Sequence, residues 1–243
     1  MGKNVSKRRL NDASRHHRAS GSEYSLYAPT SATGGGRKYL NQAERNRVLV
    51  AIGKLDDKAR LFALTLVWTG ARISEVLALK PRAFQIDQGL VAIETLKRRA
   101  WCVREVPVPP ELVRALVDHF AMDDLQRDPD RCVQPLWKFS RVTGWRVIKN
   151  VMQDAGIAGP AASPKGLRHS FGVASLQAGV PITLVQRWLG HARLSTTAIY
   201  ANVVGAEEFS FAEKFWRSSD ASPVMRSARG PMVAGATILS GIG

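Results

Sequence analysis

Several stretches of the chain carry residues whose types and spacing could bind an anion. Lys165 and Arg168 are three residues apart, so they share one face at the start of a helix that Ser163 would cap. Two cations at the positive end of a helix form, in outline, a trap for an oxyanion. His169 points elsewhere on the helical wheel, and we interpret it as a packed or capping histidine.

A second stretch, residues 69–79, contains Gly70, which allows a sharp turn. Arg72 would then start a helix, with Glu75 one turn further along the same face, where its carboxylate could hold the guanidinium. A surface ion pair of this kind is common and weak. Taken alone, the stretch therefore indicates no more than a local contact.

The remaining stretches are a basic turn and a turn followed by a short helix. Lys97, Arg98 and Arg99 form the tip of a predicted hairpin, which suits a DNA contact and equally suits a solvated turn. His191 follows the end of one helix, and a short helix then presents Tyr200. A lone tyrosine in such a place is usually half-buried packing.

Together these stretches resemble, in the right order, the motifs of the tyrosine recombinases, or phage integrase family. The resemblance covers roughly residues 41–217, which correspond to the catalytic domain of that family. Ordered matches to several motifs are much more specific than any single motif. The family's first arginine motif maps onto Arg72, with Glu75 as its acidic companion, and its hairpin lysine onto Lys97. The His/Lys-x-x-Arg box maps onto Lys165 and Arg168. The Leu-Gly-His motif maps onto His191, and the nucleophile onto Tyr200.

The resemblance implies a transesterification at a DNA phosphodiester that needs no metal or other cofactor. Arg72 and Arg168 would donate to the non-bridging oxygens, because guanidinium groups stay charged and offer paired donors. Lys165 and His191 would add donors to the same oxygens. The arginines thereby do the work that a divalent cation does in other phosphoryl-transfer sites.

The resemblance also assigns the proton transfers. Lys97 is implied as the general acid for the leaving 5′ oxygen, since an arginine cannot give up a proton. Arg98 and Arg99 would contact phosphates beside it. Tyr200 is implied as the nucleophile that forms a 3′-phosphotyrosyl link, and Lys165, if neutral, could accept its proton.

A mainly α-helical domain with a small three-stranded antiparallel sheet is expected to position these residues. Asn41 and Glu44 resemble a capping box that starts the first helix, and the hydrophobic period then changes from helical to alternating after Pro81. Strands are predicted at 83–87, 90–96 and 103–108, and further helices at 57–68, 73–79, 110–120, 141–155, 164–178, 181–189, 195–201 and 206–216.

The two ends of the chain differ in composition from this domain. Residues 1–38 carry eight Lys or Arg against two acids and lack periodicity, so we expect a disordered basic arm. Residues 39–218 would be the catalytic domain, and the Gly-, Ala- and Ser-rich residues 219–243 a flexible tail. The arm is either a solubilising segment or a segment that tracks phosphates. Its candidate DNA contacts are Lys3, Lys7, Arg8 and Arg9.

The charge balance predicts the partner. The chain has 35 Lys and Arg against 20 Asp and Glu, a net charge of +15, which favours double-stranded DNA. Cys102 and Cys132 are too few for a disulfide framework. The N-terminus lacks an apolar signal segment, and no apolar run approaches the roughly 18 residues of a membrane span. We therefore expect no membrane contact and a cytoplasmic, nucleoid-associated protein of bacterial, phage or plasmid origin.

The leading interpretation is a site-specific recombinase that integrates, resolves or inverts DNA. The resemblance implies a homo-oligomer, a tetramer on DNA, with or without a second recombinase or an accessory protein. Residues 1–38 are too short for the helical core-binding domain usual in the family, as in short members such as the fimbrial DNA invertases. The helix at 206–216 would pack on its own domain or dock on a neighbouring subunit. Two alternatives stay open: a catalytically idle DNA-binding accessory protein of the same fold, and a type IB topoisomerase-like relaxing enzyme.

Overall fold

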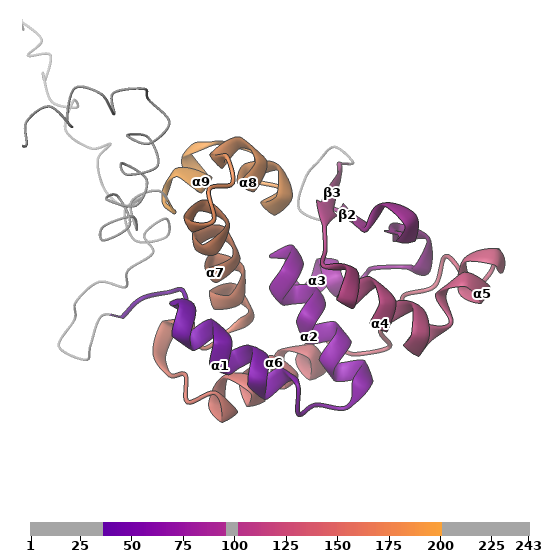
Figure 1. Cartoon of the computed structure of the whole chain (residues 1–243), viewed down its shortest axis with the longest axis horizontal. Coiled ribbons are helices and arrows are strands. Elements are labelled where there is room, and N and C mark those ends of the chain that lie inside the picture. Colours follow the sequence, from indigo (N-terminus) through magenta and orange to yellow (C-terminus); the bar gives the residue numbers. More distant parts are fainter. Residues whose placement is uncertain (1–35, 96–101, 201–243) are drawn as a thin grey trace, which may run out of the picture. The chain divides into compact units, whose positions relative to one another are not determined.

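The computed structural model describes residues 36–95 and 102–200, which form a mainly helical unit with one small sheet (Figure 1). These residues belong to the first of two units into which the chain divides, Met1–Val203. Several predictions lie outside the described residues. They are the basic arm with Lys3, Lys7, Arg8 and Arg9, the hairpin tip with Lys97, Arg98 and Arg99, the helix at 206–216 and the C-terminal tail.

The helices lie close to the positions that the sequence predicts. The helix predicted at 195–201 ends earlier, at Ala198. An unpredicted short helix, Met122–Arg127, follows Ala121, whose φ of 49° separates it from the preceding helix. The α-helices of the described residues are α1 (Gln42–Ile52), α2 (Asp57–Thr69), α3 (Ile73–Leu77), α4 (Pro110–Phe120), α5 (Met122–Arg127), α6 (Arg141–Asp154), α7 (Pro164–Gln177), α8 (Ile182–Leu189) and α9 (Ser195–Ala198).

The sheet has three antiparallel strands, as predicted, and its strand order is β1-β2-β3. Its strands are β1 (Phe84–Gln85), β2 (Leu90–Glu94) and β3 (Val103–Pro107). The first strand is shorter than the predicted 83–87, because 3-10 turns at Pro81–Ala83 and Ile86–Gln88 enclose it. Val91 pairs with Val106, and both side chains are fully buried beneath the sheet.

The predicted helix signals act as expected at the ends that matter for the site. Asn41 and Glu44 form the capping box of α1, and the Ser163 side chain accepts a hydrogen bond from a backbone N–H of α7. Gly70 and Gly190 end α2 and α8 with φ values of 60° and 67°, which glycine adopts at little cost. The chain therefore reverses sharply just before each of two predicted site segments.

The main core surrounds α2, which contacts α7 and α4. Figure 1 shows these two helices on opposite sides of α2. A second, smaller hydrophobic cluster joins α7, α8 and the end of α9. It consists of the buried residues Tyr39, Val173, Val185, Leu189 and Tyr200. Within the two described ranges, no helix is long and apolar enough to cross a membrane.

Candidate active site

A cleft of about 550 Å³ gathers most of the predicted site residues. It is lined by Arg72 at the start of α3, by Lys165 and Arg168 on α7, and by His191 and Tyr200 after α8. The lining residues in the described part of the chain include no carboxylate. A cleft with this lining suits a polyanionic ligand.

Arg168 is held inside the protein by two backbone carbonyls. Its Nη1 donates to the Gly70 carbonyl at 2.8 Å and its Nη2 to the Leu189 carbonyl at 2.6 Å. Burial lowers the pKa of Arg168 to about 10, so the guanidinium remains charged at neutral pH. A guanidinium has five N–H groups, and those that the carbonyls leave over can bind an anion in the cleft.

Arg72 is fixed by a buried carboxylate that serves two arginines. Glu75 accepts from Arg72 Nη1 at 2.7 Å through one oxygen and from Arg104 Nη2 at 2.6 Å through the other. Glu75 is only 2% exposed, so the alternative of a weak surface pair is wrong. Burial raises the pKa of Glu75, but Arg104 and then Arg72 outweigh it and hold that pKa below its usual range. The carboxylate is therefore charged and directs Arg72 toward the cleft.

Arg104 is a site residue that the sequence analysis missed. It lies on β3, donates to Thr95 Oγ1 at 3.0 Å and to the Trp188 carbonyl at 2.7 Å, and thereby ties the sheet to α8. A signal for it existed. Arg104 alternates with the outward-facing Val103 and shares the buried face of β3 with Val106, and a charge on a buried face needs a partner.

Tyr200 lies with its ring buried and its hydroxyl at the cleft. The hydroxyl is 3.1 Å from Nδ1 of His169, and the ring stacks on His191 with centroids 6.2 Å apart and planes at 16°. The ring also passes close to Gly172, where a Cβ would lie 2.8 Å from Tyr200 Cε2. Burial raises the pKa of Tyr200 and the charges of Arg168 and Arg72 oppose that change, so the phenol is protonated in the free protein.

His191 is a neutral member of the cleft. Burial, followed by the charges of Arg168 and Arg72, lowers the pKa of His191 to about 3. Its Nδ1 lies 2.9 Å from Thr197 Oγ1 at the start of the next helix. When Nδ1 accepts from that hydroxyl, the ring carries its proton on Nε2 and can donate it to an anion.

His169 is half-buried, as a packed histidine would be, but the sequence analysis missed its contact with the Tyr200 hydroxyl. One position along a helix rotates a side chain by about 100°, which turns His169 away from Arg168. The helical wheel of α7 therefore places His169 on another face than Arg168. The segment after α9 packs on α7 and brings Tyr200 to this other face, a contact that the periodicity of α7 does not predict.

The opposite wall of the cleft comes from α6 and was not predicted. Arg141 and Trp145 line it, and Trp145 is 47% exposed. Lys149 lies over the Trp145 ring, 5.8 Å from its centroid. The signal available in the sequence was an apolar pair, Val142 and Trp145, on the otherwise polar first half of this helix.

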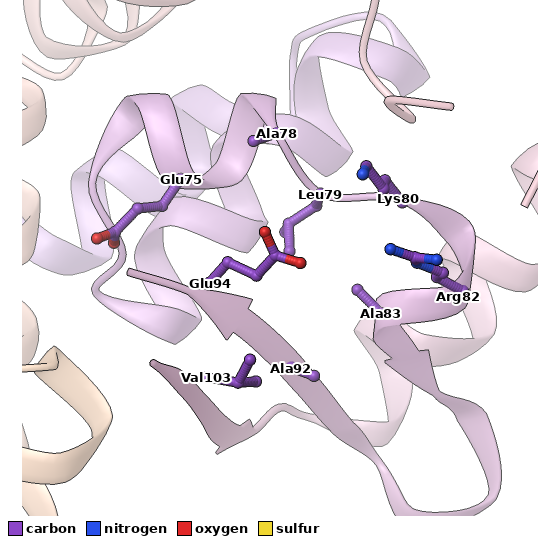
Figure 2. Close-up of a pocket in the computed structure, with 9 residues that line it drawn as sticks. All are labelled: Glu75, Ala78, Leu79, Lys80, Arg82, Ala83, Ala92, Glu94 and Val103. Carbon is purple, nitrogen blue, oxygen red and sulfur yellow. The ribbon is translucent and has the colours of Figure 1, made fainter. Parts of the chain in front are cut away.

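A second hollow of about 310 Å³ lies between α3 and the sheet (Figure 2). Figure 2 shows the Glu94 carboxylate between the strand and the helix, with Lys80 and Arg82 at one end and Glu75 at the other. Because its lining combines acidic, basic and apolar side chains, this hollow does not indicate one class of ligand. In residues 36–95 and 102–200, no three His, Cys, Asp or Glu are grouped so as to hold a metal ion.

Comparisons with known proteins identify the class to which this fold and cleft belong. Residues 38–206 match the phage integrase family, and the chain belongs to that family. This finding confirms the predicted family and the predicted fold class. The proteins that it resembles are tyrosine recombinases and integrases.

Among curated relatives, the chain is 33% identical over 176 residues to tyrosine recombinase XerA of Thermococcus kodakarensis. That alignment covers 68% of this chain and 58% of the relative, so the chain spans little more than half of the relative's length. Among solved structures, XerH recombinase bound to its difH substrate is 25% identical, with a TM-score of 0.57 over 67% of this chain and 50% of that chain. The catalytic domain of bacteriophage HP1 integrase shares the fold, with 22% identity and a TM-score of 0.53 over 75% of this chain and 96% of that domain.

Proposed function

We propose that this chain is the catalytic part of a site-specific recombinase that cleaves and rejoins DNA through a 3′-phosphotyrosyl intermediate. The observation that carries the proposal is the convergence of Arg72, Arg168 and His191 on one cleft beside the hydroxyl of Tyr200. A cleft lined by cations around a phenol suits an attack on a phosphodiester. The relative XerH, whose structure contains its difH substrate in a pre-cleavage complex, supports DNA as the ligand.

The arginines have the stabilising role. The transition state of the reaction carries extra negative charge on the non-bridging oxygens of the phosphate. Arg168, oriented by two carbonyls, and Arg72, oriented by Glu75, offer preorganised donors for that charge. Removing one such donor typically raises a barrier by about 2.7–4 kcal/mol. Lys165, exposed on the first turn of α7, and the neutral ring of His191 would add further donors.

Tyr200 has the role of nucleophile. Its oxygen attacks phosphorus, the 5′ oxygen leaves, and the protein remains joined to the 3′ phosphate. Lys97 protonates the leaving oxygen, an assignment that rests on the resemblance alone. The phosphotyrosyl bond conserves the energy of the broken phosphodiester, so a 5′ hydroxyl can reverse the step without ATP.

The test is covalent capture of DNA by Tyr200. The probe is a pool of nicked duplexes with randomised base pairs around the nick, in which a short 5′ fragment can diffuse away after cleavage. Wild-type protein should select cleavable duplexes and remain attached to them on a denaturing gel, and peptide mapping should place the adduct on Tyr200. Tyr200→Phe removes one oxygen and little volume, so it should bind the selected duplex and form no adduct.

The matched control is Tyr39→Phe, which removes the hydroxyl of another buried tyrosine in the same hydrophobic cluster. It should form the adduct like wild type. An adduct on Tyr39, Tyr24 or Tyr27, or one that persists in Tyr200→Phe, contradicts the assignment. DNA binding without any adduct would identify an idle accessory protein, and relaxation of supercoiled DNA without site preference a topoisomerase-like enzyme.

The active assembly that we propose is a homotetramer on DNA, with or without a second recombinase or accessory protein. Strand exchange between two duplexes requires cuts in four strands, and each chain supplies one nucleophile. Basic residues outside the described ranges would add phosphate contacts that do not depend on sequence. They are Lys3, Lys7, Arg8, Arg9, Arg98 and Arg99. Such a protein would act on the nucleoid of a bacterium or on phage or plasmid DNA.

A further inference from the structure

The described hydrogen-bond partner of the Tyr200 hydroxyl is Nδ1 of His169, at 3.1 Å. The two rings are tilted by 57°, with centroids 5.8 Å apart. In the proposed function, the phenol oxygen is the atom that attacks phosphorus, so its proton must leave during the reaction. We propose that His169 is the catalytic base that accepts this proton, an inference that rests on the proposed function.

The fold delivers the hydroxyl to this nitrogen through α7. His169 and Gly172 are three residues apart and therefore share a face of the helix. Because Gly172 has no side chain, the Tyr200 ring can lie against the helix, where a Cβ would approach its ring carbons to 2.8–3.0 Å. One turn further toward the start of α7, the imidazole of His169 meets the hydroxyl at the end of that ring.

The other groups of the cleft are less suited to accept the proton. Lys165, which could accept it if neutral, is exposed on the first turn of α7, and the described hydrogen-bond partner of the Tyr200 hydroxyl is His169 instead. The ring of His191 stacks on the phenol rather than meeting its hydroxyl, and its Nδ1 is engaged with Thr197. Arg72 and Arg168 are donors that stay charged. No carboxylate is among the described lining residues. His169 therefore combines a ring nitrogen with a lone pair and direct contact with the reacting oxygen.

The charges around His169 make its strength as a base depend on the substrate. Burial, followed by the charges of Lys165 and Arg168 on α7 and of Lys38 before α1, lowers the pKa of His169 to about 4. The ring is therefore neutral and can accept a proton in the free protein. Among the described residues, the neutral rings of His191 and Tyr200 also lie near it. A DNA phosphate bound among these cations would offset their field and raise the pKa of His169.

Each proton that moves during cleavage moves back during rejoining. In cleavage, the Tyr200 O–H bond breaks as the O–P bond forms, and the proton moves to Nδ1 of His169, whose own proton is on Nε2. The bond from phosphorus to the 5′ oxygen breaks, and that oxygen takes a proton from the general acid, Lys97. In rejoining, the imidazolium returns its proton to the departing tyrosine oxygen, and the amine of Lys97 takes one from the attacking 5′ hydroxyl.

The test compares His169→Asn with wild type in single turnovers on the selected nicked duplex. The amide oxygen of the introduced asparagine can still accept a hydrogen bond from the phenol, but an amide is not a base in water. We expect cleavage to slow by about 100-fold or more, as for loss of a general base, with unchanged DNA binding. The matched control is His119→Asn on α4, a histidine outside the cleft lining, which should cleave like wild type.

The pH dependence separates a base from a structural histidine. Without His169, the phenol must ionise on its own, so the rate of His169→Asn should rise tenfold per pH unit and approach that of wild type in alkali. Imidazole added to His169→Ala should restore part of the cleavage rate, since a free base can enter the space that the ring leaves. The wild-type profile gives a test without substitution, because on the acid side its rate should fall where His169 becomes protonated.

The outcomes distinguish this inference from the proposed function. If wild type forms no adduct on Tyr200, the proposed function fails. If wild type forms the adduct and His169→Asn cleaves within about threefold of it, His169 is not the base. A defect that is equal at every pH, without rescue by imidazole, would also overturn the inference and leave His169 as a packing residue. A large defect that shrinks with rising pH supports it.

Discussion

Replacing Arg104 by methionine should destabilise the domain strongly, because Arg104 is one half of a buried ion pair. The side chains of Arg104 and Glu75 are 3% and 1% exposed, so solvent screens their attraction little. Methionine preserves much of the apolar stem, but the buried Glu75 Oε2 loses its charged partner and keeps only the backbone N–H of Arg72, at 2.9 Å, among its described donors. Breaking a buried pair in this way typically costs about 3–5 kcal/mol. The lost hydrogen bonds to Thr95 and Trp188 act in the same direction.

The assay is urea unfolding at neutral pH. The free energies of unfolding of wild type and mutant are compared with the same dependence on urea concentration, the m value. A loss of about 3–5 kcal/mol is a large share of the roughly 5–15 kcal/mol that stabilises a typical domain. Arg114→Met is the matched control. It breaks an ion pair with Glu111 whose side chains are 71% and 73% exposed, and it should cost about 0–1 kcal/mol. If Arg104→Met loses no more than this control, the buried network does not stabilise the fold.

The same pair predicts how the difference varies with pH. In the folded wild type, the pKa of Glu75 lies below its ordinary value of 4.5, so the group contributes stability that is present above that pH. This stability is lost as the pH falls through the lower, folded-state pKa. Burial raises the pKa of Glu75, and in Arg104→Met only Arg72, and no longer Arg104, lowers it. The pKa of Glu75 is therefore higher in the mutant than in wild type. The stability gap between wild type and mutant should therefore narrow as the pH is lowered.

Three further predictions follow from other parts of the chain. Lys97→Ala should slow cleavage of an ordinary phosphodiester severely yet cleave a 5′-bridging sulfur substrate nearly like wild type, and equal defects on both would refute the general-acid role. Gly172→Ala should displace the Tyr200 ring and slow adduct formation. The free energy of unfolding in urea should change little, because alanine favours a helix by about 1 kcal/mol over glycine and this gain offsets the cost of displacing the ring. Deleting residues 1–36 should weaken binding similarly on all duplexes and reduce its salt dependence; a changed sequence preference with the salt slope intact would show that the arm reads bases.

The sequence was informative wherever a few adjacent residues decide the structure. The helix ends at Gly70 and Gly190 and the cap at Ser163 depend on backbone conformation and on one side chain, so local sequence predicts them. The same holds for the three strands, whose alternating burial follows from the pleat. The spacing of Arg72 and Glu75 likewise predicts their contact, because residues three apart on a helix are neighbours.

Contacts between distant segments could not be predicted in this way. The Glu75–Arg104 bond joins residues 29 apart, and the His169–Tyr200 bond joins residues 31 apart. Periodicity assigns a residue to a face of its own helix or strand, but not the segment that covers that face. For this reason Arg104 passed as an ordinary strand residue and His169 as ordinary packing, although each contacts a predicted site residue.

Under the proposed function, the two carbonyls that hold Arg168 make DNA cleavage depend on the folding of distant segments. One carbonyl lies 98 residues from Arg168 in the sequence, and the other lies 21 residues away. A full-length chain in which either helix end has unfolded still contains Tyr200, but its Arg168 guanidinium has lost one of the two carbonyls that orient it. In the proposed reaction, stabilisation of the phosphate by Arg168 therefore requires both helix ends to be folded around it.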